Sequence, residues 1–219
     1  MNLSHLARFA GSTALLLTLA GCEDPAKDKP VATVSSAAPA TTPAALPTGA
    51  GIETLAVDSA SSTVGFTGSK VTGKHDGKFE KFTGSISLAG GKAEGGRMTF
   101  DAETASVKTD DAKLDGHLKT PDFFDSEKFP KATFTSSEIK LGGASGATHT
   151  VTGELNLHGV KKTISFPATI LVGTEAVTGT SEFVINRKDF GIMTPGKTDD
   201  LIRDEVVLKL SLKAPRKKG

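Results

Sequence analysis

Cys22 is the only cysteine in the chain, and the residues before it give its sulfur a defined chemistry. It follows Leu19-Ala20-Gly21 at the end of an apolar run, and small residues before a cysteine at that place form a bacterial lipobox. In such a motif the cysteine becomes the acylated first residue of the mature chain. An ordinary cleaved signal with a cysteine nearby is the alternative interpretation. A single cysteine also excludes an intramolecular disulfide.

The apolar run from Phe9 to Ala20 has the length of a secretory signal core, and it is shorter than the roughly 20 residues of a membrane-spanning helix. We therefore predict a lipoprotein signal peptide over residues 1–21. Acyl chains on Cys22 would hold the protein at a membrane without a transmembrane helix. The predicted location is the bacterial cell envelope, lipid-anchored to a membrane and facing the periplasm or the exterior.

Residues 22–51 are rich in Ala, Thr, Ser and Pro and include five of the ten prolines. Such a composition buries too little apolar surface to offset chain entropy, so the sequence predicts a disordered tether with a reach of about 30 Å. Residues 52–219 have the length of one domain. The formal net charge is +1 and only the tail "KAPRKKG" is basic, without aromatic residues, so the sequence does not predict nucleic-acid binding.

The remaining candidate groups for chemistry are scattered. His75, His117, His149 and His158 are at least nine residues apart, so we expect exposed or locally hydrogen-bonded histidines rather than a metal site. The chain lacks a G-x-S-x-G nucleophile elbow and a Gly-rich phosphate loop, which argues against an enzyme and a nucleotide cofactor. The sequence predicts no cofactor and no particular oligomeric state.

Arg187 and Asp189 stand two residues apart in "INRKDFGI". They form either a structural ion pair near the mouth of a barrel, which we favour, or a contact to the headgroup of a ligand.

Apolar residues two apart recur in eight runs of the domain, and the intervening residues are polar. Each run is typical of a strand with one apolar face, and short Gly or Asn turns favour antiparallel pairing. The two closures that remain open are a sandwich and a barrel. A short helix is expected over Val107–Leu118, between the third and fourth strands. The inward residues are Val64 and Phe66; Phe82, Ile86 and Leu88; Met98, Phe100 and Ala102; Ala132 and Phe134; Val151, Leu155 and Leu157; Ile164, Phe166, Ala168 and Ile170; Val177, Phe183 and Ile185; and Val206, Leu208, Leu210 and Leu212.

Small residues share the inward parity with these apolar side chains. They are Gly68, Gly84, Gly153, Gly179 and Ser181. They indicate either a hollow interior that holds one small ligand or a packed core in which each small residue faces a large one.

Four blocks in order resemble the YceI-like family: "STVGFTGSKVTGKHDGKFEKFTGSISL", "HLKTPDFFDSEKFPKATFTS", "VTGELNLHGVKKTISFPATI" and "INRKDFGI". The resemblance covers nearly all of Leu55 to Lys213. It implies an all-β fold, an eight-stranded antiparallel lipocalin-like barrel with a helix, and a ligand that is an isoprenoid or another long-chain lipid.

The predicted function is therefore a membrane-tethered lipoprotein that binds such a lipid in an apolar lumen. Two alternatives stay open, a packed barrel with a structural or interaction role, and an enzyme. The predicted ligand-binding residues are Val64, Phe66, Phe82, Ile86, Phe100, Phe123, Phe124, Phe134, Leu155, Ile164, Phe166, Phe183 and Ile185.

The stretch from His117 to Phe134 carries four phenylalanines among charged residues and two prolines. It is either a recognition loop or a hydrophobic lid over the barrel. We favour the lid, in which Phe123, Phe124 and Phe129 pack inward at the end of the barrel and the charged residues face water.

The lipobox predicts a simple biochemical outcome for Cys22→Ser. The wild-type protein should enter the detergent-rich phase on phase partitioning, because its acyl chains insert into micelles. The Cys22→Ser protein should lack this lipid-dependent partitioning. Unchanged partitioning would refute lipidation.

Overall fold

The computed structural model describes residues 24–36, 51–193 and 201–216. The predicted signal peptide, Cys22 and residues 37–50 lie outside this part of the chain. Twelve strands and one α-helix make up its regular structure. The strands are β1 (Thr33–Ser36), β2 (Ile52–Ala56), β3 (Thr63–Lys70), β4 (Gly73–Phe79), β5 (Phe82–Ala89), β6 (Lys92–Glu103), β7 (Val107–Thr109), β8 (Lys131–Leu141), β9 (His149–Leu157), β10 (Val160–Val172), β11 (Ala176–Asn186) and β12 (Glu205–Pro215).

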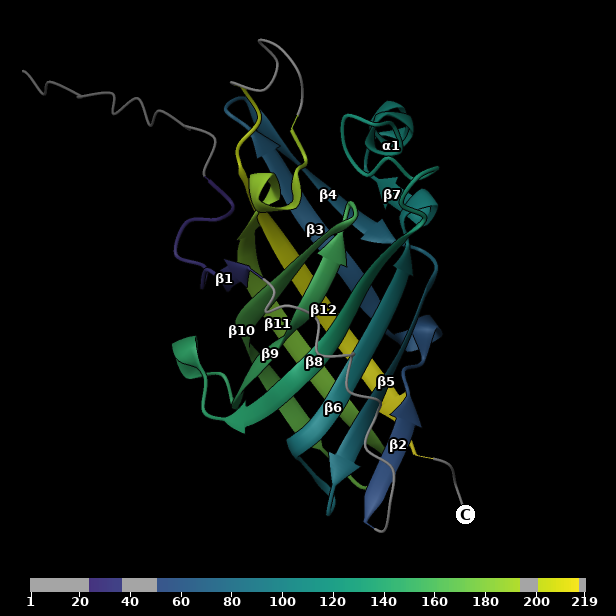
Figure 1. The fold of residues 1–219 in the computed structure, drawn as a ribbon, viewed down its shortest axis with the longest axis vertical. Coiled ribbons are helices and arrows are strands. Elements are labelled where there is room, and N and C mark those ends of the chain that lie inside the picture. The colour runs from purple at the N-terminus through teal and green to yellow at the C-terminus, as the bar shows by residue number, and fades with distance from the viewer. Residues whose placement is uncertain (1–23, 37–50, 194–200, 217–219) are drawn as a thin grey trace, which may run out of the picture.

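These strands form one curled sheet, a half-barrel, with the order β2-β5-β6-β8-β9-β10-β11-β12-β3-β4-β7 (Figure 1). All of these neighbouring pairs are antiparallel. Near the β2 edge, the Asp58 amide donates to the Lys213 carbonyl of β12 at 2.8 Å, which brings two remote strands of the sheet together. The fold is therefore a single curled sheet and not a sandwich.

Each of the eight predicted strands is present, but a total of eight strands is wrong. The additional strands are β1, β2, β4 and β7. They are short or carry few apolar residues, so a search for alternating apolar side chains misses them.

Strand β4 shows the physical reason. Its sequence "GKHDGKF" has glycine at Gly77, where alternation would require an apolar side chain. The ring of Phe66, which pairs with Gly77 from β3, fills that space, because a Cβ on Gly77 would overlap the ring. Phe66 of the neighbouring strand β3 thus provides the apolar side chain that β4 lacks at Gly77.

The ladder between β10 and β11 is interrupted near Pro167. The paired residues begin at Thr169 and Thr180, and the Pro167 carbonyl accepts a hydrogen bond from Ser181 Oγ at 2.5 Å instead. Because the N–H and C=O of a strand residue point to the same side, Pro167 lacks a donor towards β11. The two strands separate beyond this point.

Strand β1 occupies the resulting gap. It pairs antiparallel with β10, from Thr33 opposite Ser165 to Ser36 opposite Lys162. On its other side, the Ala32 amide donates to the Val184 carbonyl at 2.8 Å, and the Val184 amide donates to Pro30 at 2.9 Å. The prediction that residues 22–51 form a disordered tether is therefore wrong for residues 24–36. Residues 30–36 hydrogen-bond to the open edges of β10 and β11, and Asp24 and Lys29 form ion pairs with Arg203 and Glu182.

The helix α1 (Ala112–Leu118) lies at one end of the half-barrel (Figure 1). Asp111 caps it by accepting a hydrogen bond from the Lys113 amide at 2.8 Å. The predicted helix began at Val107, but Val107–Thr109 form β7, which pairs with β4. In the described residues no helix has the length and apolar character needed to cross a membrane.

Two adjacent positions test the role of the segment before β1. Ala32 is 4% exposed and belongs to the main core cluster, whereas Val31 is 71% exposed. We expect Ala32→Asp to lower the free energy of unfolding by about 3 kcal/mol, because it buries an unpaired carboxylate. Val31→Asp is the matched control and should change it by less than about 0.5 kcal/mol.

Urea denaturation followed by circular dichroism measures both values. Equal stability of the two variants would show that this segment does not contribute to the folded core.

Candidate functional site

The concave side of the half-barrel encloses a row of apolar cavities. Within the described residues their volumes are about 180, 90 and 30 Å³. The largest cavity lies at the end covered by α1, since Leu118, Phe123 and Phe124 form part of its wall. The smallest lies toward the other end, between residues such as Val177 and Ala214.

Neighbouring cavities share wall residues, so they follow one another through the interior. Ala132, Leu155 and Leu208 border both the largest and the middle cavity. Phe166 and Leu210 border both the middle and the smallest cavity. Met98 and Leu212 also border both of these cavities, so the three spaces together outline a narrow apolar path.

Eleven of the thirteen predicted ligand-binding residues lie on these walls: Phe66, Ile86, Phe100, Phe123, Phe124, Phe134, Leu155, Ile164, Phe166, Phe183 and Ile185. Val64 and Phe82 do not border the three cavities. The Phe82 ring stacks on Phe100 with centroids 5.2 Å apart, so it supports the wall from behind. Val64 packs against the smaller core cluster that contains Phe66.

The inward glycines divide into two classes. A Cβ at Gly84 would lie 2.7 Å from the Phe100 ring, and a Cβ at Gly153 would lie 2.6 Å from the Phe134 ring. These two glycines face large partners, as a packed core requires. Gly68 and Gly179 border cavities, and nothing lies within 4 Å of their Cβ positions. The interior is thus packed around the first pair and hollow beside the second.

The segment after α1 closes the largest cavity. Phe124 contacts Phe79 and Phe66, with ring centroids 5.5 and 6.2 Å apart, and Phe123 contacts His117 at 5.0 Å. Inward packing of Phe123 and Phe124 is confirmed. It is wrong for Phe129, whose ring lies against His158 at 4.8 Å with Lys128 Nζ above it.

Asp115 attaches α1 to the sheet. Its carboxylate accepts hydrogen bonds from Lys108 Nζ at 2.6 Å and from both the hydroxyl and the amide of Thr109 in β7. The Lys108 hydrogen bond, followed by those of Thr109, lowers the pKa of Asp115 to about 2. The ionised carboxylate therefore holds the covering segment in place at neutral pH.

Arg187 lies beside the largest cavity with its side chain buried. Its guanidinium donates to the carbonyls of Ile192 at 2.8 Å and Arg203 at 3.2 Å, and it contacts the Asp204 carboxylate at 3.3 Å. Among the described residues its carboxylate partner is Asp204, so the predicted pair with Asp189 is wrong. These contacts make Arg187 a clamp between the η4 turn (Arg187–Phe190) and the start of β12.

The four histidines occupy separate places. His75 Nδ1 lies 2.8 Å from Asp110, His117 Nε2 lies 3.5 Å from Asp122, and His149 Nδ1 lies 2.7 Å from the Thr148 hydroxyl. Burial lowers the pKa of His149. No group of three or more metal-ligating side chains occurs in the part of the chain that the structure describes.

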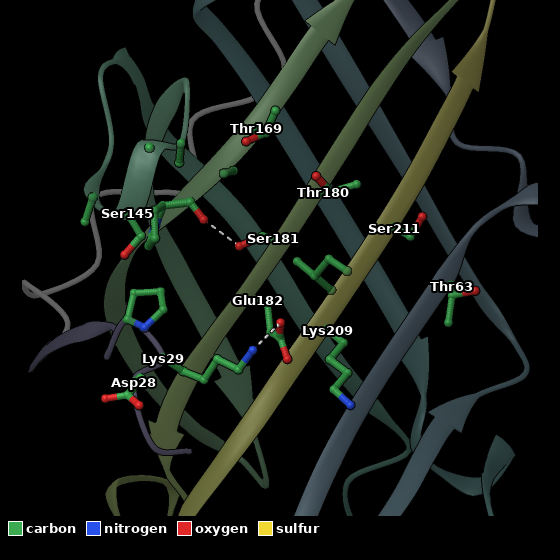
Figure 2. Close-up of a pocket in the computed structure, with 17 residues that line it drawn as sticks. Asp28, Lys29, Thr63, Ser145, Thr169, Thr180, Ser181, Glu182, Lys209 and Ser211 are labelled. Carbon is green, nitrogen blue, oxygen red and sulfur yellow. Dashed lines mark hydrogen bonds and ion pairs between the residues drawn. The ribbon is translucent and has the colours of Figure 1, made fainter. Parts of the chain in front are cut away.

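The hollow with the largest volume among the described residues is a groove on the outer face of the sheet (Figure 2), and it shares Ala168, Thr180, Ser181 and Leu210 with the smallest interior cavity. It measures about 780 Å³ and runs between Asp28–Pro30, the η3 turn (Ala144–Gly146) and the outer faces of β10, β11 and β12. Hydroxyl groups and the Lys29–Glu182 ion pair, at 2.9 Å, occupy it. An open groove with a mixed polar and apolar lining suits a long apolar ligand less well than the enclosed apolar cavities, so the interior cavities are the better candidate site.

Several wall residues of the largest cavity were missing from the predicted site. Leu157 and Val206 belong to the predicted apolar faces, so their parity could have identified them. Leu118, Ile192 and Ile202 lie outside those alternating runs, and only the fold brings them to this end of the sheet. Together with these residues, Phe79, Ser69, Arg187 and Arg203 also border the cavity.

Comparison with known proteins gives a consistent set of relatives. A family model described as the YceI-like domain matches residues 55–214. A UPF0312 protein of Pseudomonas putida is 35% identical over 132 residues, which are 58% of this chain and 68% of that protein.

Solved structures agree with this match. The crystal structure of BcnA from Burkholderia cenocepacia has a TM-score of 0.64 and 28% identity, and covers 72% of this chain and 99% of BcnA. A polyisoprenoid binding domain from Saccharophagus degradans has the same fold, with a TM-score of 0.57 at 16% identity over 76% of this chain and 99% of that domain.

The Asp115 contacts predict an acid-sensitive cover. A lowered carboxyl pKa stabilises the folded form above the usual value near 4, and this contribution is lost as the pH falls through about 2. We expect α1 to lose protection from hydrogen exchange between about pH 4 and 2. Asp115→Asn should remove this pH dependence, whereas Asp101→Asn on the outer surface should keep it. An unchanged pH profile in Asp115→Asn would contradict this role.

Proposed function

Because this chain belongs to the YceI-like family, we propose that it binds an isoprenoid or another long-chain lipid inside its half-barrel, for storage or transport. The observation that carries this proposal is the row of apolar cavities with shared walls. A narrow path of this kind suits a thin, linear apolar molecule better than a compact or polar one. The relation in fold to a polyisoprenoid binding domain supports the same class of ligand.

The energetics favour an occupied interior. An unfilled space of about 180 Å³ costs on the order of 4 kcal/mol at about 24 cal/mol per Å³. Each CH₂ group that a ligand buries there contributes about 0.8 kcal/mol before the entropic costs of binding. Small rotations of the shared residues Leu155, Leu208 and Phe166 would join the cavities around one continuous chain.

The polar groups on the wall argue for binding rather than catalysis. Ser69, Arg187 and Arg203 border the largest cavity. Arg187 and Arg203 are committed to backbone carbonyls and carboxylates, and this set offers no base beside a nucleophile. The open cavities also weigh against the alternative of a packed barrel with a purely structural role.

We further propose that Cys22 carries the lipid that attaches the protein to an envelope membrane. The apolar segment and the lipobox support this part of the proposal. The folded part that begins at Asp24 then faces the periplasm or the exterior.

Filling the largest cavity from its wall tests ligand binding. Gly68→Leu places a side chain in open space, so the fold should be retained and the bound lipid should fall by about tenfold or more, a loss of about 1.4 kcal/mol in binding. Gly73→Leu in β4 is the matched control, because its Cβ position is also open and borders none of the three cavities. Its lipid content should equal that of the wild type.

Mass spectrometry of organic extracts from the purified proteins measures the lipid. Repeated recovery of an empty wild-type protein, without thermal stabilisation by prenyl lipids, would overturn the proposed function.

A further inference from the structure

The end of the half-barrel that holds the largest cavity displays three exposed apolar side chains. Val71, in the turn between β3 and β4, is 53% exposed, Met193 is 60% exposed and Leu201 is 50% exposed. The Val71 amide donates to the Leu201 carbonyl at 3.1 Å, which joins two of these positions directly. We call Val71, Met193 and Leu201 the apolar tip.

The apolar tip is continuous with the cavity wall. Ile192 and Ile202 border the largest cavity, and each is the chain neighbour of an exposed residue of the tip. An isolated β-bridge between Lys70 and Ile202 fixes this relation. Met193 and Leu201 are thus exposed, while the residues next to them in the chain border the cavity where we propose that the lipid binds.

The N-terminal segment leaves the fold at the same end. Asp24 Oδ2 lies 2.8 Å from Arg203 Nη1, and Arg203 borders the largest cavity. Lys29 pairs with Glu182 at 2.9 Å, and β1 is held between β10 and β11. Residue 22 is two residues before Asp24, so a group attached there starts within about 7 Å of it.

The β3–β4 hairpin gives its side of the apolar tip a positive charge that suits an anionic membrane surface. Lys70 and Lys74 flank Val71 in the β3–β4 hairpin, and both are exposed. A lysine near anionic headgroups contributes about 1 kcal/mol to membrane association. Exposed apolar side chains beside lysines fit the boundary between headgroups and acyl chains.

We propose that the apolar tip is the membrane-docking surface, which sets the largest cavity against the bilayer so that lipid passes directly between them. The passage of lipid rests on the proposed function, but docking itself is a separate property. The binding partner of the apolar tip is thus a lipid bilayer surface.

The opposite end of the half-barrel supplies an internal control. Leu141, Leu171 and Val172 are also exposed, but they lie at the end where β12 finishes, away from Arg203 and the largest cavity. Both ends of the half-barrel thus expose apolar residues, but only the apolar tip lies near the largest cavity and Asp24. The proposal requires only the apolar tip to enter the membrane.

The chain contains no tryptophan and no tyrosine, so one introduced tryptophan reports on its own surroundings. The experiment uses residues 24–219, which include every described element but lack Cys22, with Val71→Trp and Leu171→Trp compared. With vesicles of phosphatidylethanolamine and phosphatidylglycerol, we expect a blue-shifted emission and quenching by brominated lipids for Val71→Trp only. Adding Met193→Ser and Leu201→Ser to Val71→Trp should weaken vesicle binding by about tenfold.

A shift for Leu171→Trp alone, or for neither protein while circular dichroism shows both folded, would overturn the proposal. Lipid extracted from the same samples separates the two hypotheses. Retained lipid without docking would overturn docking and leave lipid binding in place, whereas docking of a protein that is always empty would overturn the proposed function.

Discussion

The missing N–H of Pro167 is the constraint on which the wall of the half-barrel depends. Without that donor the ladder between β10 and β11 stops near Ser181, and the sheet would be open beyond it. The residues up to Ser36 close this gap with hydrogen bonds to both strands. Because of this one proline, residues 30–36 are needed to close the wall, although their composition predicts a segment outside the fold.

The hollow interior depends on which glycines lack a partner. Gly84 and Gly153 receive the rings of Phe100 and Phe134, so their absent side chains cost no packing. Gly68 has no such neighbour, and the space in front of it belongs to the largest cavity. The same residue type therefore produces tight packing in one place and an apolar opening in another.

The cover over the largest cavity is attached by both polar and apolar contacts. Asp115 joins α1 to Lys108 and Thr109, while Phe123 and Phe124 supply its apolar underside. The ion pair and hydrogen bonds of Asp115 lie at the margin of the cover, close to solvent. Phe123 and Phe124 lie over the cavity. Separation of this cover from the sheet would break the Asp115 contacts and would also expose Leu118, Phe123 and Phe124.

The sequence by itself determined the antiparallel β class, the eight apolar strands and most residues of the cavity walls, because alternation assigns each side chain to a face. It also indicated that Phe123 and Phe124 pack inward. It could not identify β4, whose apolar cover comes from Phe66, or β1, whose order depends on open edges far along the chain. Only the tertiary structure decided between a packed and a hollow interior, because cavity volume depends on which side chains meet across the sheet.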